Sequence, residues 1–361
     1  MSLILDEYKD PQKARRILDA IHSIVGDKKI KLMEVCGTHT QAIFRYGIRG
    51  LLPNGIEIVS GPGCPVCVTP NSFIDTLIAL SEIESCIIVV FGDLLKVPGS
   101  RSTLLKEKSK GKDVRIVYSP LDALEIAIKE KQKMVVFSGI GFETTAPSIA
   151  VTILEAEKKD VKNFFVLSAI KLLPPALKSL ISSKELPLNG LILPGHVSAI
   201  IGLDEYRFLA EEYSIAGVVA GFEPLDILMA IYSLSRMITT HSPSLENKYT
   251  RVVKPKGNEK ARKILGEVFE ECDSEWRGLG LIRRSGLALR REFSHRNPLN
   301  VISVGVESSK ENPDCICGSI LRGVKKPTAC LLFGKTCTPE NPIGACMVSN
   351  EGSCAAYFKY S

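Results

Sequence analysis

The stretch Lys29-Ile-Lys-Leu-Met-Glu-Val-Cys-Gly-Thr-His-Thr40 joins a short, largely apolar run to a glycine-containing turn. Similar apolar runs recur along the chain, and they are typical of strands covered on both faces. The candidate strands are Lys29–Val35, Ile56–Ser60, Ile87–Phe91, Val114–Tyr118, Met134–Phe137, Phe164–Leu167, Leu191–Leu193 and Gly217–Ala220. Candidate helices lie at Asn71–Ile83, Leu121–Lys131, Ala146–Lys158, Leu203–Tyr213 and Leu225–Arg236. This alternation predicts an α/β fold with parallel sheets and right-handed crossovers.

Short motifs follow several of these strands, where open α/β sheets place their ligand crevices. They are Cys36-Gly-Thr-His-Thr40, Gly61-Pro-Gly-Cys-Pro-Val-Cys67, Gly139-Ile-Gly-Phe-Glu-Thr-Thr-Ala-Pro147, Pro194-Gly-His-Val-Ser198 and Gly221-Phe-Glu-Pro224. The same arrangement in both halves predicts two similar parallel-sheet α/β domains, at residues 1–131 and 132–245. After Arg236 the pattern weakens, and a charged helix is expected at Glu259–Glu271. Residues 246–361 are expected to form a small cysteine-rich C-terminal domain.

The composition excludes several classes of function. The chain has 361 residues, with 46 basic and 40 acidic side chains and a net charge of +6. Lys and Arg do not cluster with aromatic residues, which argues against nucleic acid as a partner. The longest apolar run, Cys86 to Phe91, suits a buried strand and is far shorter than a membrane span. Because the first ten residues become charged early, no signal peptide is expected, and the cytoplasm is the predicted location.

Cysteines are concentrated near the C-terminus. Six of the eleven lie at Cys315, Cys317, Cys330, Cys337, Cys346 and Cys354. In a reducing compartment, many cysteines suggest metal binding or redox chemistry before disulfides. One choice of four thiolates for a 4Fe–4S cluster leaves Cys317 and Cys346 as a second pair. Structural zinc is the rival interpretation and inert thiols the third, although the paired spacing of zinc ligands is matched only at Cys315 and Cys317.

A second group of cysteines follows the first two candidate strands. The pair Cys64 and Cys67 has the spacing of a redox dithiol, with a helix expected to begin at Pro70 after an N-cap at Thr69. Half of a zinc knuckle, or two buried thiols, would show the same pattern. Cys36 and His39 follow the preceding strand, so all four side chains are expected to converge at one crevice facing the second α/β domain. Sulfur atoms and an imidazole there would make an iron or redox site.

Taken together, these motifs resemble the HypD family of nickel–iron hydrogenase maturation proteins. The resemblance covers nearly the whole chain and rests chiefly on the CGTHT and GPGCPVC strings and the C-terminal cysteine pattern. It implies a pair of similar α/β domains plus a small domain that carries a 4Fe–4S cluster. It also implies a scaffold, formed with a small HypC partner, on which iron gains cyanide and carbon monoxide ligands. HypE would deliver the cyanide, and the finished Fe(CN)2CO unit would pass to the hydrogenase large subunit.

The resemblance also implies roles for individual residues. Cys36 would hold the iron together with a cysteine of HypC, and Cys64 and Cys67 would be a redox pair or further iron ligands. The cluster ligands would be Cys315, Cys330, Cys337 and Cys354. Cys317 and Cys346 could pass electrons between cluster and site, in an arrangement similar to ferredoxin:thioredoxin reductase.

Such a protein is a redox-active assembly scaffold rather than a conventional turnover enzyme. His39 is more plausible as a proton handler or orienting group than as an obligatory iron ligand. Two other functions remain open from the sequence. One is a stand-alone iron–sulfur thiol–disulfide oxidoreductase that acts on a protein partner, and the other is a zinc-stabilised binding module without chemistry.

Overall fold

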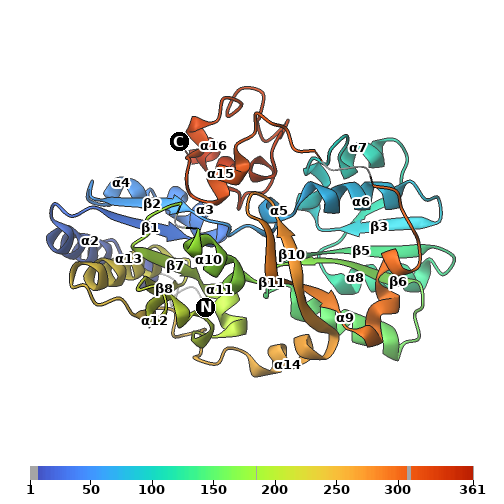
Figure 1. Ribbon diagram of the computed structural model, residues 1–361, viewed down its shortest axis with the longest axis horizontal. Coiled ribbons are helices and arrows are strands. Elements are labelled where there is room, and N and C mark those ends of the chain that lie inside the picture. Colours follow the sequence, from blue (N-terminus) through green and yellow to red (C-terminus); the bar gives the residue numbers. More distant parts are fainter. Residues whose placement is uncertain (1–6, 184, 307–309, 361) are drawn as a thin grey trace.

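The computed structural model describes residues 7–183, 185–306 and 310–360. Residues 1–6, on which the signal-peptide expectation partly depends, lie outside the described residues. Two sheet-containing lobes lie side by side, and the cysteine-rich C-terminal region covers the junction between them (Figure 1). Across the described residues, no helix combines the length and apolar character needed to span a membrane.

Each lobe is built on one parallel sheet. The first sheet has the order β2-β1-β7-β8-β9 and the second has the order β4-β3-β5-β6. Their strands are β1 Ile30–Glu34, β2 Ile56–Ser60, β3 Cys86–Val90, β4 Val114–Ile116, β5 Met134–Gly141, β6 Phe164–Ile170, β7 Gly190–Pro194, β8 Ala216–Ala220 and β9 Leu245–Asn247. All eight predicted strands are present, and the predicted α/β class with two parallel sheets is confirmed.

The two sheets do not follow the predicted ranges 1–131 and 132–245. Strands β1 and β2 lie in the first sheet with β7, β8 and β9, whereas β3 to β6 form the second sheet. Each sheet therefore takes strands from both sides of Lys131. The chain crosses to the second lobe after β2 and returns after β6, so the motifs of the first lobe come from distant parts of the sequence.

Helices cover both faces of each sheet, which explains why the strands are apolar throughout. In the first lobe, α2 and α13 pack on one face and α10, α11 and α12 on the other. The α-helices are α2 Pro11–Val25, α3 Gly37–Arg45, α4 Ile48–Leu51, α5 Pro65–Val68, α6 Asn71–Ser81, α7 Leu104–Ser109, α8 Pro120–Lys129, α9 Ala146–Lys158, α10 Leu173–Ser182, α11 Gly195–Ile201, α12 Phe208–Glu211, α13 Pro224–Thr239, α14 Glu259–Val268, α15 Cys317–Leu321 and α16 Ser353–Tyr360.

Local sequence signals set several of the helix starts. Asp10 caps α2 by accepting hydrogen bonds from the backbone of Gln12 and Lys13, and Pro11 occupies the first turn. Ser119 begins α8 with a reciprocal capping box to Asp122. The predicted N-cap at Thr69 is wrong by one residue, because Pro70 takes the cap position of α6. The Thr69 hydroxyl instead donates to the carbonyl of Pro65.

Two predicted helices differ from the structure. The segment expected to be a helix at Leu203–Tyr213 is divided into a 3-10 helix at Asp204–Tyr206 and the short helix α12. The charged helix ends at Val268 rather than Glu271, and the chain continues as strand β10, Phe269–Trp276. This strand pairs antiparallel with β11, Gly280–Leu289. The hairpin is held in place by the second lobe, since the Leu172 backbone N–H donates to the carbonyl of Ser285. Pairing between the two strands of the hairpin overrides local helix propensity.

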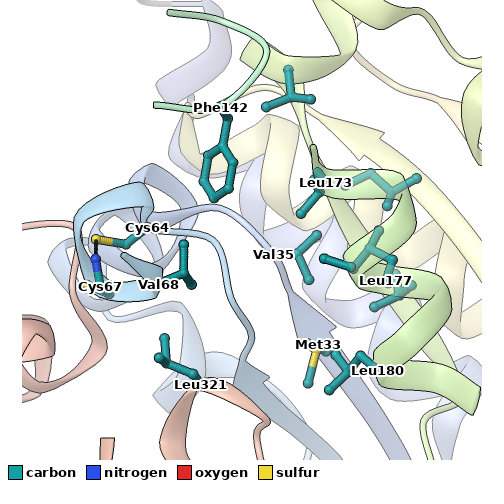
Figure 2. Packing of buried hydrophobic residues seen from close by; sticks show 14 of the residues in the cluster. Met33, Val35, Cys64, Cys67, Val68, Phe142, Leu173, Leu177, Leu180 and Leu321 are labelled. Carbon is teal, nitrogen blue, oxygen red and sulfur yellow. Dashed lines mark hydrogen bonds between the residues drawn. The ribbon is translucent and has the colours of Figure 1, made fainter. Parts of the chain in front are cut away.

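A shared apolar core joins the lobes to the C-terminal region. Figure 2 shows Met33 on β1, and Val35 just after this strand, opposite the leucines of α10, with Phe142 from the second lobe above them. Cys64, Cys67 and Val68 of α5 belong to the same buried cluster, as does Leu321 of the C-terminal region. The loops that carry the Cys36 and Cys64 motifs therefore pack against one shared hydrophobic core.

Phe142 tests how strongly this core joins the lobes. Its side chain is 6% exposed and packs 6.0 Å from the Trp276 ring centre. We expect Phe142→Ala to lower the free energy of unfolding by about 3–5 kcal/mol, because it removes a buried aromatic ring and leaves a cavity. The matched control is Tyr118→Ala, at a side chain that is 95% exposed. Urea titrations that give equal losses for both variants would contradict this account of the core.

Candidate metal and thiol site

Four motifs meet at the carboxyl edge of the first sheet. Cys36 follows β1 and Cys64 follows β2, and these strands pair in parallel from Ile30 with Ile56 to Glu34 with Ser60. His196 follows β7, and Gly221 follows β8, the next strands in the same sheet. The prediction that the Cys36 and Cys64 motifs end neighbouring strands of one sheet is confirmed.

The first two motifs are in direct backbone contact. The Gly37 N–H donates to the carbonyl of Gly63 at 3.0 Å. A Cβ atom at Gly63 would lie only 2.2 Å from the Cys36 backbone nitrogen. Only glycine can therefore occupy position 63 without moving the Cys36 loop away from the Cys64 loop.

Cys36 lies at the start of α3 and is 8% exposed. Burial raises the pKa of its thiol to about 12, although the backbone N–H groups of His39 and Thr38 act in the opposite direction. The thiol is therefore protonated at neutral pH, and a metal that binds there must displace its proton.

Glu34 holds the Cys36 loop through hydrogen bonds, although no sequence motif indicated this residue. One carboxylate oxygen accepts from the Cys36 N–H at 3.2 Å, and the other accepts from the Thr40 hydroxyl at 2.5 Å. The side chain is fully buried, and this burial raises its pKa to about 7. The signal in the sequence is a lone acidic residue inside an apolar strand just before a cysteine motif, where an unpaired charge would be costly.

His39 fastens the first motif to the motif that follows β8. Its Nε2 atom donates to the carbonyl of Gly221 at 2.8 Å, and its ring lies 4.8 Å from the Phe222 ring. Burial lowers the pKa of the imidazole to about 4, so the ring is neutral at pH 7. Among the described residues, Nδ1 has no hydrogen-bond partner. His39 is therefore suited to orient the Cys36 loop through Nε2, while Nδ1 can accept a hydrogen bond.

Cys64 and Cys67 are linked within one helical turn. The Cys64 sulfur accepts a hydrogen bond from the Cys67 N–H at 3.2 Å, as Figure 2 shows. The Cys67 thiol also contacts the C-terminal region, where it donates to the carbonyl of Ala345 at 3.8 Å. Both side chains are buried. The pair thus contacts a segment that is far away in the sequence.

The C-terminal region also contacts the Cys36 motif. The Thr38 hydroxyl donates to a Glu351 carboxylate oxygen at 2.8 Å. Gly37 packs so closely that a Cβ atom there would lie 2.3 Å from the Glu351 Cβ. Further along, the Phe44 and Tyr357 rings meet edge to face at 4.5 Å. No motif in the sequence indicated Glu351, because only the folded chain brings it to residue 38.

Five cysteines line one small cavity in the C-terminal region. The lining residues are Cys315, Cys317, Ile320, Cys330, Leu332, Phe333, Cys337, Gly344, Met347 and Cys354. All four cysteines predicted as cluster ligands are in this set, together with Cys317. A Cβ atom at Gly344 would lie 2.6 Å from the sulfurs of both Cys315 and Cys317, so these two thiols approach the backbone closely.

Cys346 connects this cavity to the Cys64–Cys67 pair. The thiols of Cys317, Cys354 and Cys67 interact with its sulfur and lower the pKa of Cys346 well below the usual value. Burial, together with the Cys346 and Cys64 side chains, raises the pKa of Cys67. The thiols of Cys67, Cys346, Cys317 and Cys354 are therefore neighbours, and Cys317 and Cys354 also line the cysteine cavity.

The second lobe contributes a buried acid near this edge. Glu143 accepts a hydrogen bond from the Leu173 N–H at 2.8 Å, and burial raises the pKa of the carboxyl to about 7.

In the parts of the chain that the structure describes, no three His, Cys, Asp or Glu side chains have the arrangement of a metal-ion site.

The neutral state of His39 gives the folding stability a defined pH dependence. The folded-state pKa of about 4 lies below the ordinary value of 6.5, so the unfolded chain takes up the proton first as pH falls. The stabilisation is therefore fully present above pH 6.5 and is lost progressively down to pH 4. Relative to His39→Gln, we expect the wild-type chain to lose about 2 kcal/mol of unfolding free energy between pH 7 and pH 5.

The measurement is urea unfolding followed by circular dichroism, at both pH values and for both proteins. Glutamine keeps a donor for the Gly221 carbonyl but does not titrate, so the other buried acids affect both chains alike. An identical pH dependence in the two proteins would show that His39 is not buried in the neutral form.

Comparisons with known proteins agree over nearly the full length. A family model described as HypD, hydrogenase formation hypA family, matches residues 12–361. The chain is 44% identical over 364 residues to hydrogenase maturation factor HypD2 of Bradyrhizobium diazoefficiens, covering 98% of this chain and 96% of that protein. It is 41% identical over 364 residues to hydrogenase maturation factor HypD of Escherichia coli, covering 99% and 97%.

A putative hydrogenase expression/formation protein of Methanocaldococcus jannaschii is 44% identical over 347 residues, with 96% of both chains covered. Bacterial and archaeal relatives thus share one full-length pattern with this chain. The match of the family model and these identities show that the chain belongs to the HypD family of hydrogenase maturation factors.

Proposed function

We propose that this chain is the scaffold on which the iron centre of a nickel–iron hydrogenase is assembled, together with a small HypC-like partner. The observation that carries the proposal is the series of thiol contacts between two cysteine groups. Cys67 interacts with Cys346, which in turn interacts with Cys317 and Cys354 beside the cysteine cavity. An assembly site and a source of electrons would then be adjacent.

The iron is the cargo of this scaffold, and Cys36 is the residue proposed to hold it. Cys36 follows β1 at the carboxyl edge of the sheet, and 8% of its surface is exposed, compared with 0% for Cys67. A HypC-like partner would add a second cysteine ligand, and a HypE-like protein would deliver cyanide. The finished unit, with cyanide and carbon monoxide bound, would pass to the hydrogenase large subunit. Cys64 and Cys67 would act beside Cys36 as a redox pair or as further iron ligands.

The chemistry of the residues around the cysteine cavity supports the proposal that a 4Fe–4S cluster binds there. The donor atoms on the cavity wall are thiols, and the remaining wall is mainly apolar, with Ile320, Leu332, Phe333 and Met347. Cys315, Cys330, Cys337 and Cys354 would hold the cluster, which supplies single electrons when bound. An apolar wall of this kind excludes water and so helps to set the reduction potential.

The cysteines outside the cluster set would carry electrons as dithiols. When Cys64 and Cys67 form a disulfide, they release two electrons and two protons, and the reverse reaction restores the thiols. Cys317 and Cys346 can undergo the same change one step nearer to the cavity. His39 and Glu34 would keep the Cys36 loop in place during this exchange, through their contacts with Gly221 and the Cys36 N–H.

Burial favours this scaffold role over a stand-alone thiol–disulfide oxidoreductase. A reductase for protein disulfides must present a sulfur atom to its substrate. Cys64 and Cys67 are both buried, and Cys67 faces the C-terminal region. A reducing compartment such as the cytoplasm is the proposed place of action, because thiols there stay available for metal binding and redox exchange.

The cluster assignment is tested by Cys330→Ala. We expect anaerobically purified variant protein to lose most of its iron and acid-labile sulfide, and its absorption near about 400 nm, because one of four thiolate ligands is missing. Cys317→Ala should keep the cluster. Cys86→Ala, at a buried cysteine within β3, is the matched control for loss of a thiol elsewhere. Full iron and sulfide content in Cys330→Ala would refute the assignment.

The iron assignment is tested by infrared spectroscopy of the complex between this chain and its HypC-like partner. Bands of iron-bound cyanide and carbon monoxide are expected in the wild-type complex and absent from Cys36→Ala, because the thiolate that anchors the iron is gone. Cys272→Ala, at a half-buried cysteine in β10, should leave the bands unchanged. Undiminished bands in Cys36→Ala would show that another residue holds the iron.

A further inference from the structure

A second pocket, distinct from the cysteine cavity, lies between the second lobe and the C-terminal region. Its volume is about 470 Å³, and its walls come from residues 96–106 on one side and from residues 310–317 and 340–344 on the other. Cys315 and Cys317 form part of the wall, so the pocket adjoins the cysteine cavity. A volume of this size is typical of sites for small molecules.

Positive charge dominates the pocket. Its lining includes five cationic side chains, at Lys96, Arg101, Lys106, Arg277 and Lys310. The acidic side chains in the lining are Glu311 and Glu340. Such an excess of positive charge in a concave site raises the local concentration of anions.

Arg277 is the buried member of this set, with 5% of its surface exposed. Its Nε atom donates to the carbonyl of Thr69 at 3.0 Å, and Nη1 donates to Glu311 at 3.1 Å. The third nitrogen, Nη2, is buried and has no hydrogen-bond partner among the described residues. Leaving a buried charged donor unpaired is costly, so an acceptor at this position would be strongly favoured.

Asn71 lines the same pocket. Its amide nitrogen donates to the carbonyl of Lys310 at 3.0 Å, which fixes the orientation of the side chain. The carbonyl oxygen, Oδ1, is buried and has no partner among the residues described. The side chain is 6% exposed. A ligand that satisfies this oxygen must carry an O–H or N–H group.

We propose that this pocket binds a small phosphate-bearing anion, with Arg277 donating to a phosphate oxygen and Asn71 accepting from a phosphate hydroxyl. A monoprotonated phosphate supplies both an anionic acceptor and a donor. Ionised carboxylate and sulfate groups supply acceptors alone, so they leave Asn71 unpaired. This difference favours a phosphate group over the acidic side chains of a docked protein. The inference does not depend on the iron chemistry.

The test is calorimetric titration of the anaerobically purified full-length chain with inorganic phosphate, sulfate and polyglutamate in turn, at constant ionic strength. We expect phosphate to bind at least about tenfold more tightly than sulfate, the scale of one charged hydrogen bond. Arg277→Gln should weaken phosphate binding by about tenfold or more. Asn71→Ala should abolish the preference for phosphate over sulfate.

A rim variant covers the case in which the buried substitutions impair folding. Lys96, Lys106 and Lys310 are exposed, and replacing all three with alanine should weaken phosphate binding at least about fivefold. The charge-matched control replaces the exposed Lys129, Lys131 and Lys158, which are not among the pocket-lining residues and lie in α8, the turn after it and α9. Absence of phosphate binding, equal affinity for sulfate, equal effects of the two triple variants, or binding of polyglutamate alone would each overturn the proposal.

Discussion

The structure depends on the contact between the Cys64–Cys67 helix and the C-terminal region. Cys67 is the residue at which the two meet, through the carbonyl of Ala345 and the thiol of Cys346. On one side, this contact closes the carboxyl edge of the first sheet. On the other, it places the cysteine cavity next to that edge. The Thr38–Glu351 hydrogen bond and the Phe44–Tyr357 ring contact join the C-terminal region to the same edge.

The order of strands explains how one short edge can hold so many functional residues. Parallel sheets gather their carboxyl ends on one side, and loops at that side are free to vary. Here the chain leaves the first sheet after β2 and returns at β7, so the first two motifs face the motifs after β7 and β8. The hydrogen bond from His39 to Gly221 joins residues that are 182 positions apart in the sequence, and it holds the loops after β1 and β8 together.

Much of this could be predicted from the sequence, because strands and motifs are local signals. Apolar runs identified every strand of the two sheets except β9, a three-residue strand without an apolar run. The hairpin of β10 and β11 could not be predicted, because the charged residues of β10 are also typical of an exposed helix. Only the pairing with β11 makes this segment a strand. Glu351 gave no signal either, because its partner Thr38 lies over three hundred residues away. The boundary near Lys131 failed to separate the sheets because a regular alternation of strands and helices does not reveal a crossing between lobes.

The most direct test of this account is to trap the contact between Cys67 and Cys346. In full-length protein carrying Cys64→Ser, Cys67 has lost its neighbour, so mild oxidation with diamide should join it to Cys346. Mass spectrometry of the digested protein should then detect the peptide pair that contains both residues. A Cys67 that stays reduced, or that pairs only between molecules, would contradict the arrangement in which the C-terminal cysteines rest on the Cys64–Cys67 helix.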